Sequence, residues 1–587
     1  HFELYVDGNL THTKSDEEML EQSVQSTLHR GKHRIAVKML NTTDELKFAA
    51  TASFDEEKFS DLTMQHSVEP NRNLTIHDIL EGENISSSSI SPSGKYVIVN
   101  YEDVQKGSGE RLKYSVLKNL KTGENMMVTR SGQKKFVKWL PKSDRISYGV
   151  DINGHTNLYL YDVESSKEQV IAKEIKDLAY YWWSPDEQQI VYSIKDKAEE
   201  TGETKRIYGN EDRIPGFRDR SFLKMLNVES GDRMRLTAGN LSTSFHDFHP
   251  SGDKFIFSTS YPVYTEIPYS KQNLYEMNLT DFSLDTLWKD KQYAGQVQYA
   301  PTGNTLLVQG GPLCFGEVGI NLSGDKTPNN YDNQLYFYDR ESNQAESITK
   351  EFKPAVSAAK WFSEDEIYIR VNEKDYINLY RYRVDKEKFE KVNLETEVLG
   401  QIDFAEEKPF AVYSGTSIST PESLFYLNLK KETSELIDQP KTLDQIVFGK
   451  TEKWNFTNKQ GTTIHGRVYY PPNYNADKKY PVIVYYYGGT SPVERSFDGR
   501  YPKNIWAANG YIVYVLQPSG ATGFGQDFSA LHVNGWGKEQ TSDVIEGTKK
   551  FLEAHPSADS DNVGAIGASY GGYTTMFLQT QTDIFKT

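Results

Sequence analysis

A turn followed by a strand recurs along the middle of this 587-residue chain. In two clear copies, Ser91-Pro92-Ser93-Gly94 and His249-Pro250-Ser251-Gly252 each lead into an apolar run. The prolines at positions 92, 141, 185, 250 and 301 are 44 to 65 residues apart, and degenerate copies of the turn follow at residues 363–365 and 405–407. Periods of this length that contain several short strands are typical of β-propeller blades. The repeat therefore predicts a propeller over residues 75–445.

A second repeated segment follows several of these turns and resembles a further strand of the same blade. Its copies lie at residues 157–161, 273–275, 334–338, 378–380 and 423–426. Seven copies of the turn favour seven blades and leave eight open, and a long β-sandwich array is the alternative. Residues 195–220 and 310–330 interrupt the pattern and are expected to form loops that protrude from the blades.

Residues 1–70 precede the repeat and have a different pattern. Asp7-Gly8 lies between two alternating runs, which indicates a β-hairpin. Residues 33–40 form a largely apolar run, and further strands are expected there and at 46–49. We expect a β-sandwich-like accessory module, joined to the propeller by a linker that begins at Pro70.

Residues 446–587 show the alternation of strands and helices that is typical of an α/β domain. The apolar runs 481–487 and 511–516 are typical of buried strands, and residues 541–554 form a helical pattern that Thr541 or Ser542 could cap. This order predicts a parallel sheet. The predicted fold class is therefore multidomain, with an N-terminal β-module, a seven- or eight-bladed propeller and the N-terminal part of an α/β-hydrolase domain.

The motif Gly567-Ala568-Ser569-Tyr570-Gly571 lies between an apolar strand and a helical stretch. In this context a G-x-S-x-G motif holds a nucleophilic serine in a sharp, strained turn. Ser569 is therefore the predicted nucleophile of an acyl-transfer reaction. Such a reaction needs donors for the developing oxyanion. The Tyr570 backbone N–H is one candidate, and the Tyr487 hydroxyl, at a strand end followed by two glycines, is the other.

The chain resembles the prolyl oligopeptidase family of serine peptidases, in which a propeller precedes an α/β-hydrolase domain. The motifs that carry the resemblance are Tyr487-Gly488-Gly489, the elbow Gly567-Ala568-Ser569-Tyr570-Gly571-Gly572-Tyr573, residues 517–525 and 534–537, and Asp543. The elbow is closest to the dipeptidyl-peptidase and acylaminoacyl-peptidase-like branch. The resemblance implies a serine exo- or oligopeptidase that cleaves short peptides, with a propeller that limits access to the active site.

The general base and the acid are not found at family-like positions in this sequence. The usual order on this fold is serine, then acid, then histidine, and no histidine follows Ser569. His465, His532 and His555 precede it and match no catalytic position. The acid and the base are therefore expected beyond Thr587, in a protein longer than this chain, and the chain alone is expected to be inactive.

One departure from the family pattern leaves other functions open. The family's dipeptidyl peptidases carry a paired-glutamate insertion shortly before a Trp-Ser-Pro turn, and the segment before Trp183-Ser184-Pro185 lacks such a pair. A strict dipeptidyl peptidase is therefore not favoured. An esterase or acyl hydrolase on the same scaffold, or a catalytically incomplete binding protein, are the alternatives.

The composition excludes several classes of partner. The net charge of −16 disfavours nucleic acid and anionic membrane surfaces. One cysteine, Cys314, excludes an intrachain disulfide framework, and no metal motif occurs, so we expect no cofactor and no metal. No apolar run is long enough to span a membrane. Short peptides are the expected partners, self-association into a homo-oligomer is left open, and the start at His1 favours a periplasmic or secreted protein over a cytoplasmic one.

Overall fold

The computed structural model describes residues 2–14, 23–28, 33–39, 49–53, 58, 71–130, 134–198, 207–441 and 443–587. The chain divides into two compact units, His1–Glu69 and Pro70–Thr587. The boundaries of the three expected domains remain predictions, and each compact unit is described by itself.

The first unit contains a three-stranded antiparallel sheet in the order β2-β1-β3. Its strands are β1 (Phe2–Val6), β2 (Asn9–Lys14) and β3 (Ile35–Met39). Asp7 and Gly8 both have positive φ, 51° and 83°, which is the backbone geometry of a tight two-residue hairpin turn. The predicted hairpin is therefore confirmed. Most of the strand expected at 46–49 lies outside the described residues, so the sandwich-like architecture stays a prediction.

Seven successive sets of four antiparallel strands make up most of the described part of the second unit. The first four sets are β5 (Gly82–Ile90), β6 (Tyr96–Val104), β7 (Arg111–Asn119), β8 (Asn125–Arg130); β9 (Lys134–Trp139), β10 (Arg145–Ile152), β11 (His155–Asp162), β12 (Lys167–Lys176); β13 (Leu178–Trp183), β14 (Gln189–Asp196), β15 (Arg220–Asn227), β16 (Arg233–Arg235); and β17 (Thr243–Phe248), β18 (Lys254–Pro262), β19 (Ser270–Asn278), β20 (Leu284–Lys291).

The last three sets are β21 (Ala294–Tyr299), β22 (Thr305–Gly310), β23 (Gln334–Asp339), β24 (Ala345–Ser347); β25 (Ala355–Ser363), β26 (Glu366–Glu373), β27 (Tyr376–Arg383), β28 (Lys388–Val392); and β29 (Val398–Phe404), β30 (Phe410–Ser417), β31 (Thr420–Asn428), β32 (Thr433–Asp438). A single parallel pair, Ile377 with Val398, joins the sixth and seventh sets into one eight-stranded sheet. The 3₁₀ helix η2 (Val384–Lys386) lies between β27 and β28.

The repeats found in the sequence occupy equivalent places in these sets. Each of the seven predicted turns connects the first and second strands of a set, as residues 91–95 do between β5 and β6. The five copies of the second segment all lie in third strands, such as β11 and β19. The repeat therefore predicted correctly that these strands exist and where they lie within each set.

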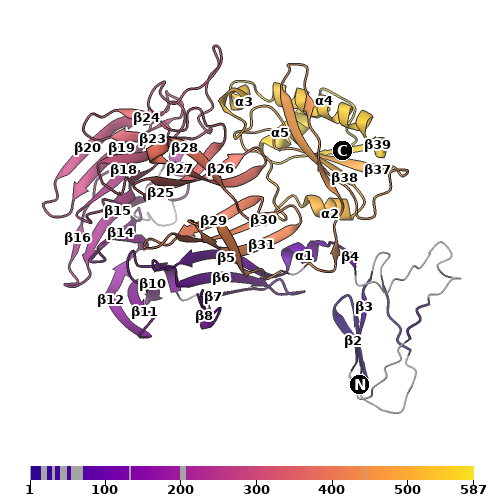
Figure 1. Ribbon diagram of the computed structural model, residues 1–587, viewed down its shortest axis with the longest axis horizontal. Coiled ribbons are helices and arrows are strands. Elements are labelled where there is room, and N and C mark those ends of the chain that lie inside the picture. Colours follow the sequence, from indigo (N-terminus) through magenta and orange to yellow (C-terminus); the bar gives the residue numbers. More distant parts are fainter. Residues whose placement is uncertain are drawn as a thin grey trace. The chain divides into compact units, whose positions relative to one another are not determined.

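Apolar clusters between successive sets close them into a ring (Figure 1). The seventh set packs on the first through a cluster that includes Val97, Val99, Val412 and Leu424, each fully buried. A hydrogen bond of 2.8 Å from the Ile90 backbone N–H to Asp403 Oδ2 crosses the same seam. Side chains, rather than a strand shared between the two sets, therefore close the ring.

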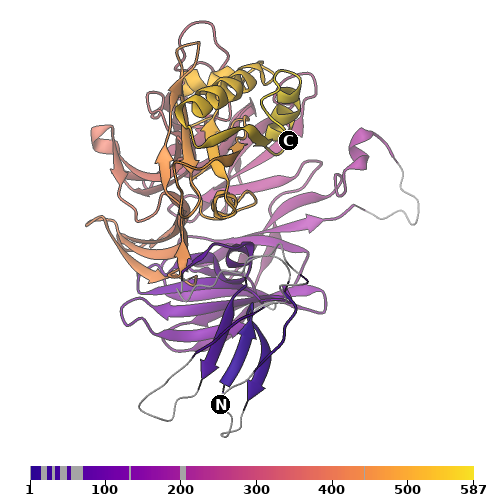
Figure 2. The same ribbon diagram turned by 90° about the vertical axis from the view of Figure 1, so that its right-hand side faces the viewer.

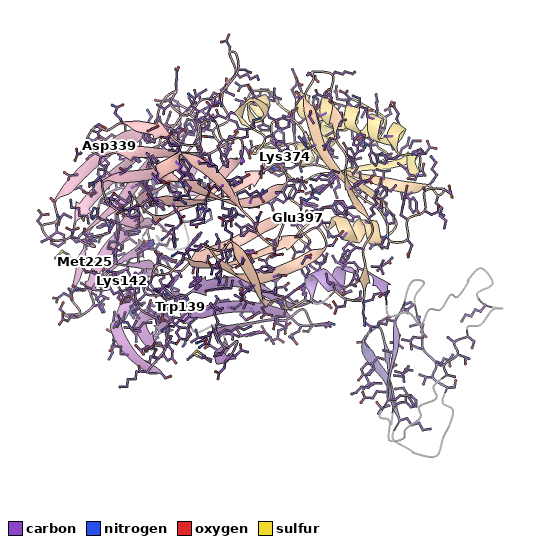
Figure 3. The ribbon with its side chains drawn as sticks, in the orientation of Figure 1. Trp139, Lys142, Met225, Asp339, Lys374 and Glu397 are labelled. Atoms are coloured by element: carbon purple, nitrogen blue, oxygen red, sulfur yellow. The ribbon has the colours of Figure 1, made fainter. Side chains whose placement is uncertain are left out.

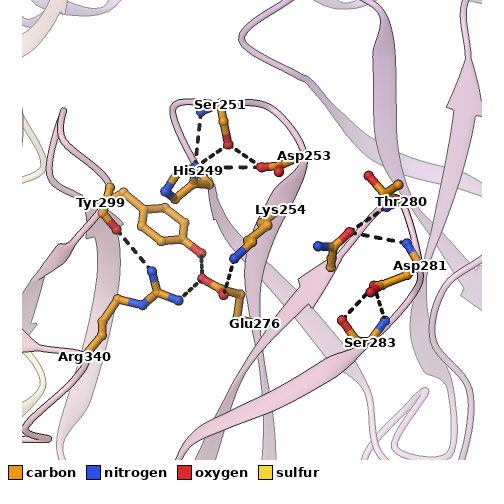
Figure 4. A network of polar contacts seen from close by, with 12 residues as sticks. His249, Ser251, Asp253, Lys254, Glu276, Thr280, Asp281, Ser283, Tyr299 and Arg340 are labelled. Atoms are coloured by element: carbon orange, nitrogen blue, oxygen red, sulfur yellow. Dashed lines mark hydrogen bonds and ion pairs between the residues drawn. The ribbon is translucent and has the colours of Figure 1, made fainter.

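A buried carboxylate joins the fourth and fifth sets (Figure 4). Glu276 on β19 is 3% exposed and accepts a hydrogen bond of 2.6 Å from the Tyr299 hydroxyl. The Arg340 guanidinium donates to the same carboxylate, and Lys254 lies 3.6 Å from it. Two cations and a phenol thus satisfy a charge that would be costly to bury alone.

The C-terminal part of the second unit is a six-stranded mixed sheet in the order β34-β36-β38-β37-β39, with β35 on β36. These strands are β34 (Thr451–Lys453), β35 (Phe456–Thr457), β36 (Thr463–Tyr469), β37 (Tyr480–Tyr485), β38 (Ile512–Gln517) and β39 (Ala558–Ile566). β37 pairs in parallel with both β38 and β39, whereas β36 is antiparallel to β38. The expectation of a parallel sheet is therefore right for the central strands and wrong for the entry strand.

The helices around this sheet are α2 (Lys503–Ala508), α3 (Gln526–Ser529), η3 (Ala530–His532), α4 (Lys538–Ala554) and α5 (Tyr570–Gln579). Helix α4 begins three residues earlier than expected, and Gly537 rather than Thr541 or Ser542 is its N-cap. Gly537 has a φ of 79°, which suits a glycine. Val544, Thr548 and Phe551 are among the buried residues of α4.

The two expected loops connect second and third strands. One carries η1 (Asn210–Arg213) and projects away from the ring in Figure 2. The other, residues 311–333, lies against α3, where the Gln526 amide donates a hydrogen bond of 2.8 Å to the Gly319 carbonyl. The remaining elements, β4 (Arg72–Asn73), α1 (Ile76–Leu80) and β33 (Ile446–Val447), lie where the chain enters and leaves the ring.

Candidate active site

Ser569 lies in a sharp turn between β39 and α5, in an energetically unfavourable backbone conformation. Its φ and ψ are 52° and −117°, outside the regions that non-glycine residues ordinarily occupy. Such strain persists only when the surrounding structure holds it, and it is concentrated at functional sites. The side chain is exposed. The structure thus gives Ser569 the elbow geometry that the motif predicted.

Two of the elbow glycines are required by close backbone contacts. A Cβ atom on Gly567 would lie 2.6 Å from the Gly571 carbonyl carbon, and one on Gly571 would lie 3.0 Å from the Tyr487 carbonyl oxygen. Both neighbours are backbone atoms and cannot rotate away. Gly572 differs, because the nearest atom to its Cβ would be 3.6 Å away, an ordinary contact.

These contacts predict that a glycine-to-alanine substitution has different effects at two positions of the same motif. Gly567→Ala is expected to displace Ser569 and lower kcat/KM by at least about 100-fold, because a misplacement of about 1 Å can have that effect. Gly572→Ala, the matched control, is expected to remain close to wild type. Steady-state kinetics and thermal melting of both variants measure this. Equal activity of the two variants would show that the elbow does not depend on the close packing of Gly567.

Tyr487 lies beside this elbow. It follows β37, which is the parallel neighbour of β39, so the two strands end at the same edge of the sheet. Gly488 has a φ of 69°, and a Cβ on Gly489 would lie 2.5 Å from the Tyr487 ring. The two glycines therefore allow the chain to turn and the ring to pack over it. The structure brings the Tyr487 backbone next to Gly571, two residues beyond Ser569.

Tyr570 is the first residue of α5, and its backbone N–H has no acceptor within the helix. Its ring packs against His532, with 4.8 Å between ring centroids, and against Tyr573, with 5.4 Å. The orientation of the elbow places this N–H at the same turn as Ser569. A donor at the position after the nucleophile is what an oxyanion hole of this kind uses.

The three histidines of this domain lie in different surroundings. His532 stacks on Tyr570, and burial lowers its pKa. His555 Nδ1 donates to the Phe551 carbonyl over 2.8 Å, and its ring stacks on the Phe551 ring. His465 packs near Phe524. That none of them is catalytic remains a prediction.

A buried aspartate fixes the segment that follows β38. Asp543 on α4 is 1% exposed and accepts hydrogen bonds from the Asn458 amide at 2.7 Å and the Ser519 N–H at 2.8 Å. Burial raises its pKa. The Gln540 amide donates to the Ser519 carbonyl at 2.6 Å. The sequence singled out Asp543, and the structure shows that it anchors residues 517–519 rather than contacting Ser569.

A charge network joins the hydrolase sheet to the ring. Arg467 on β36 is fully buried, and its guanidinium lies 2.9 Å from Asp375, which follows β26. Arg495 lies 3.1 Å from the same carboxylate and 2.9 Å from Glu397. Figure 3 shows Lys374 and Glu397 on the side of the ring that faces the hydrolase elements. Arg467 also donates to the carbonyls of Val493 and Glu494, so the network holds the loop after β37.

A cavity of 290 Å³ lies beside Tyr487 and is formed largely by this loop. Residues 491–503 supply most of its wall, together with Tyr485 and Tyr487. Sequence reasoning did not find this cavity or the Asp375 network. The only available signal was the charged stretch Glu494-Arg495 soon after the Tyr487 strand end. The ionic partners of Arg495 are about a hundred residues away in the sequence.

A strained serine elbow at the edge of a mixed sheet, preceded by a ring of four-stranded sheets, defines the class of protein: an α/β-hydrolase domain with a β-propeller. The sequence profile described as the prolyl oligopeptidase family matches residues 496–587. The resemblance that the motifs indicated is therefore confirmed, with residues 496–587 matching the profile of this family.

Known proteins of this family support the same assignment. Dipeptidyl-peptidase 5 of Schizosaccharomyces pombe is 26% identical over 363 residues, which are 57% of this chain and 47% of the relative. Dipeptidyl-peptidase 5 of Porphyromonas gingivalis is 21% identical over 539 residues, 85% of this chain and 75% of the relative. The acylaminoacyl peptidase structure of Pyrococcus horikoshii has a TM-score of 0.67 at 18% identity, covering 86% of this chain and 76% of that one. The structural likeness shows the shared fold.

The matched part of the chain spans about half the length of the Schizosaccharomyces relative. Among the described residues, no group of three or more histidine, cysteine or acidic side chains is arranged to hold a metal ion. In the same residues, every helix is too short or too polar to cross a bilayer.

Proposed function

We propose that this protein is a serine peptidase that hydrolyses short peptides through an acyl-enzyme on Ser569. The observation that carries the proposal is the strained conformation of Ser569 between β39 and α5, beside the Tyr487 strand end. The family and the names of the relatives, dipeptidyl-peptidase and acylaminoacyl peptidase, support peptide substrates and release of short terminal fragments.

The proposed reaction has two steps on one serine. Ser569 Oγ attacks the peptide carbonyl carbon, and a general base, expected C-terminal to Ser569 in the family order, takes the hydroxyl proton. The Tyr487 hydroxyl and the Tyr570 N–H donate to the oxyanion. The C–N bond then breaks, the leaving amine takes the proton, and water hydrolyses the Ser569 ester.

In this proposal, the ring limits which peptides can reach Ser569. We infer that the seven four-stranded sets are the blades of a seven-bladed propeller that covers the site and admits short or extended peptides. The contacts from the 311–333 loop to α3, and from Asp375 to Arg467, support a stable position of the ring over the hydrolase sheet. Export to the periplasm or the medium, and self-association, remain predictions.

A fluorophosphonate probe tests the proposal directly, because it reacts with activated serines. In the whole protein the probe is expected to label Ser569, as peptide mapping by mass spectrometry would show. Ser569→Ala is expected to lose the label while keeping the melting temperature. A wild-type protein that stays unlabelled would support the alternative of a catalytically incomplete binding protein. Turnover of matched ester and peptide substrates separates a peptidase from an esterase.

A further inference from the structure

The cavity beside Tyr487 contains a buried lysine whose ammonium has no partner. Lys503, the first residue of α2, lines the cavity and is 5% exposed. Neither the hydrogen bonds nor the ion pairs of the described residues include its Nζ atom. Its nearest recorded neighbour is the Tyr485 ring, 5.9 Å from Nζ to the ring centroid. Most of its hydration is lost, and no acceptor among the described residues replaces it, so an acceptor from outside the chain would be bound favourably.

The other walls supply mainly hydrogen-bond donors. Three tyrosines, Tyr485, Tyr487 and Tyr501, surround the cavity and each has a phenolic O–H. Arg500 also lines it and is exposed. A small anionic group that accepts several hydrogen bonds is therefore the chemistry that this wall fits best.

Two carboxylates in the wall, Glu494 and Asp498, need separate consideration. Burial, together with the nearby Arg467, lowers the pKa of Lys503 to about 7, and the two carboxylates oppose this shift through space. Neither carboxylate is within ion-pair distance of Lys503 in the described structure, so they leave its hydrogen-bonding capacity unused. A cationic ligand on Glu494 would place a second ammonium near Lys503 and still leave Lys503 without an acceptor.

We propose that this cavity is a carboxylate subsite anchored on Lys503, which takes the carboxylate end of a short peptide. The inference rests on the proposed peptidase function, because Tyr487 both lines the cavity and is the proposed oxyanion donor. A carboxylate held there lies close to the bond being cleaved. The subsite would thus favour peptides that end soon after that bond.

Calorimetric titration tests binding without turnover when the Ser569→Ala protein is used. Triglycine is expected to bind at least about tenfold more tightly than triglycinamide, which differs only in lacking the carboxylate. Lys503→Met is expected to abolish that difference, and Lys503→Arg to restore part of it. Lys549→Met, on the exposed face of α4, is the matched control and should keep the full difference. Equal affinity for the acid and the amide would overturn the proposal.

A second pair of measurements distinguishes the source and sign of the bound charge. An amidated peptide with one aspartate tests whether a side-chain carboxylate binds as well as a C-terminal one. Glu494→Gln is expected to tighten triglycine binding, because it removes a repelling charge without disturbing Lys503. This variant also tests the subsite if Lys503→Met does not fold. Weaker binding would identify an ammonium site instead. Loss of fluorophosphonate labelling with intact triglycine binding would contradict the peptidase proposal and not the subsite.

Discussion

Replacing Asp375 by alanine is expected to lower the free energy of unfolding by about 3–5 kcal/mol. The carboxylate is the shared partner of Arg467 and Arg495, whose side chains are 1% and 9% exposed. Its removal leaves both guanidinium groups buried without the negative charge that offsets the cost of burying them. Of the two, Arg495 keeps Glu397, whereas Arg467 keeps only neutral acceptors.

Chemical denaturation, followed by fluorescence of the hydrolase and ring tryptophans, measures this effect. Asp385→Ala is the matched control, because Asp385, in η2, has a 41% exposed side chain that lies 3.4 Å from Arg383. Such pairs contribute about 0–1 kcal/mol. The double variant Asp375→Ala with Arg495→Leu should be more stable than the sum of the single changes. Similar losses for Asp375→Ala and Asp385→Ala would mean that the buried network contributes little.

Replacing Tyr487 by phenylalanine is expected to lower kcat by about 100- to 1,000-fold, the usual effect of removing one oxyanion donor. The ring remains to pack over Gly489, so the fold and the melting temperature should be unchanged. KM should change little, because the hydroxyl would act on the charge that develops in the transition state.

Steady-state kinetics of the whole protein with a short peptide measures this split. Tyr511→Phe removes the hydroxyl of a partly exposed tyrosine before β38 and serves as the control. An unchanged kcat in Tyr487→Phe would exclude the hydroxyl from the oxyanion hole. A rise in KM alone would place Tyr487 in substrate binding only.

Local sequence signals predicted the strands of the ring well. The Pro-containing turns could be recognised in the sequence because each reverses the chain between two strands, and the fixed φ of proline suits such a turn. Third strands such as β11 share an aromatic and apolar pattern, which was also found. In contrast, the third strands β7 and β15 lack the Leu-Tyr or Leu-Phe pair that the other five third strands share, and they were missed. They are held in place by their neighbours rather than by their own pattern.

In the candidate site too, residues marked by a local sequence signal were predicted, whereas residues whose role depends on distant parts of the chain were not. Ser569, Tyr570 and Tyr487 were predicted because glycines next to them mark sharp turns. The predicted N-cap of α4 was wrong. Thr541 and Ser542 have side chains that often cap helices, but the N-cap is Gly537, which has a left-handed backbone conformation. Asp375 and Lys503 were not predicted, because their significance depends on burial and on residues far away in the chain.

The places where the chain enters and leaves the ring lie side by side. β4 and β33 pair in parallel, Arg72 with Ile446 and Asn73 with Val447, although more than 370 residues separate them. The chain therefore leaves the ring beside the point at which it entered the ring. Insertions in its outer loops can change the surface of the ring, while the chain still passes from β33 into the hydrolase sheet at the same position. Under the proposed function, this arrangement would allow access to the site and the serine elbow to evolve separately.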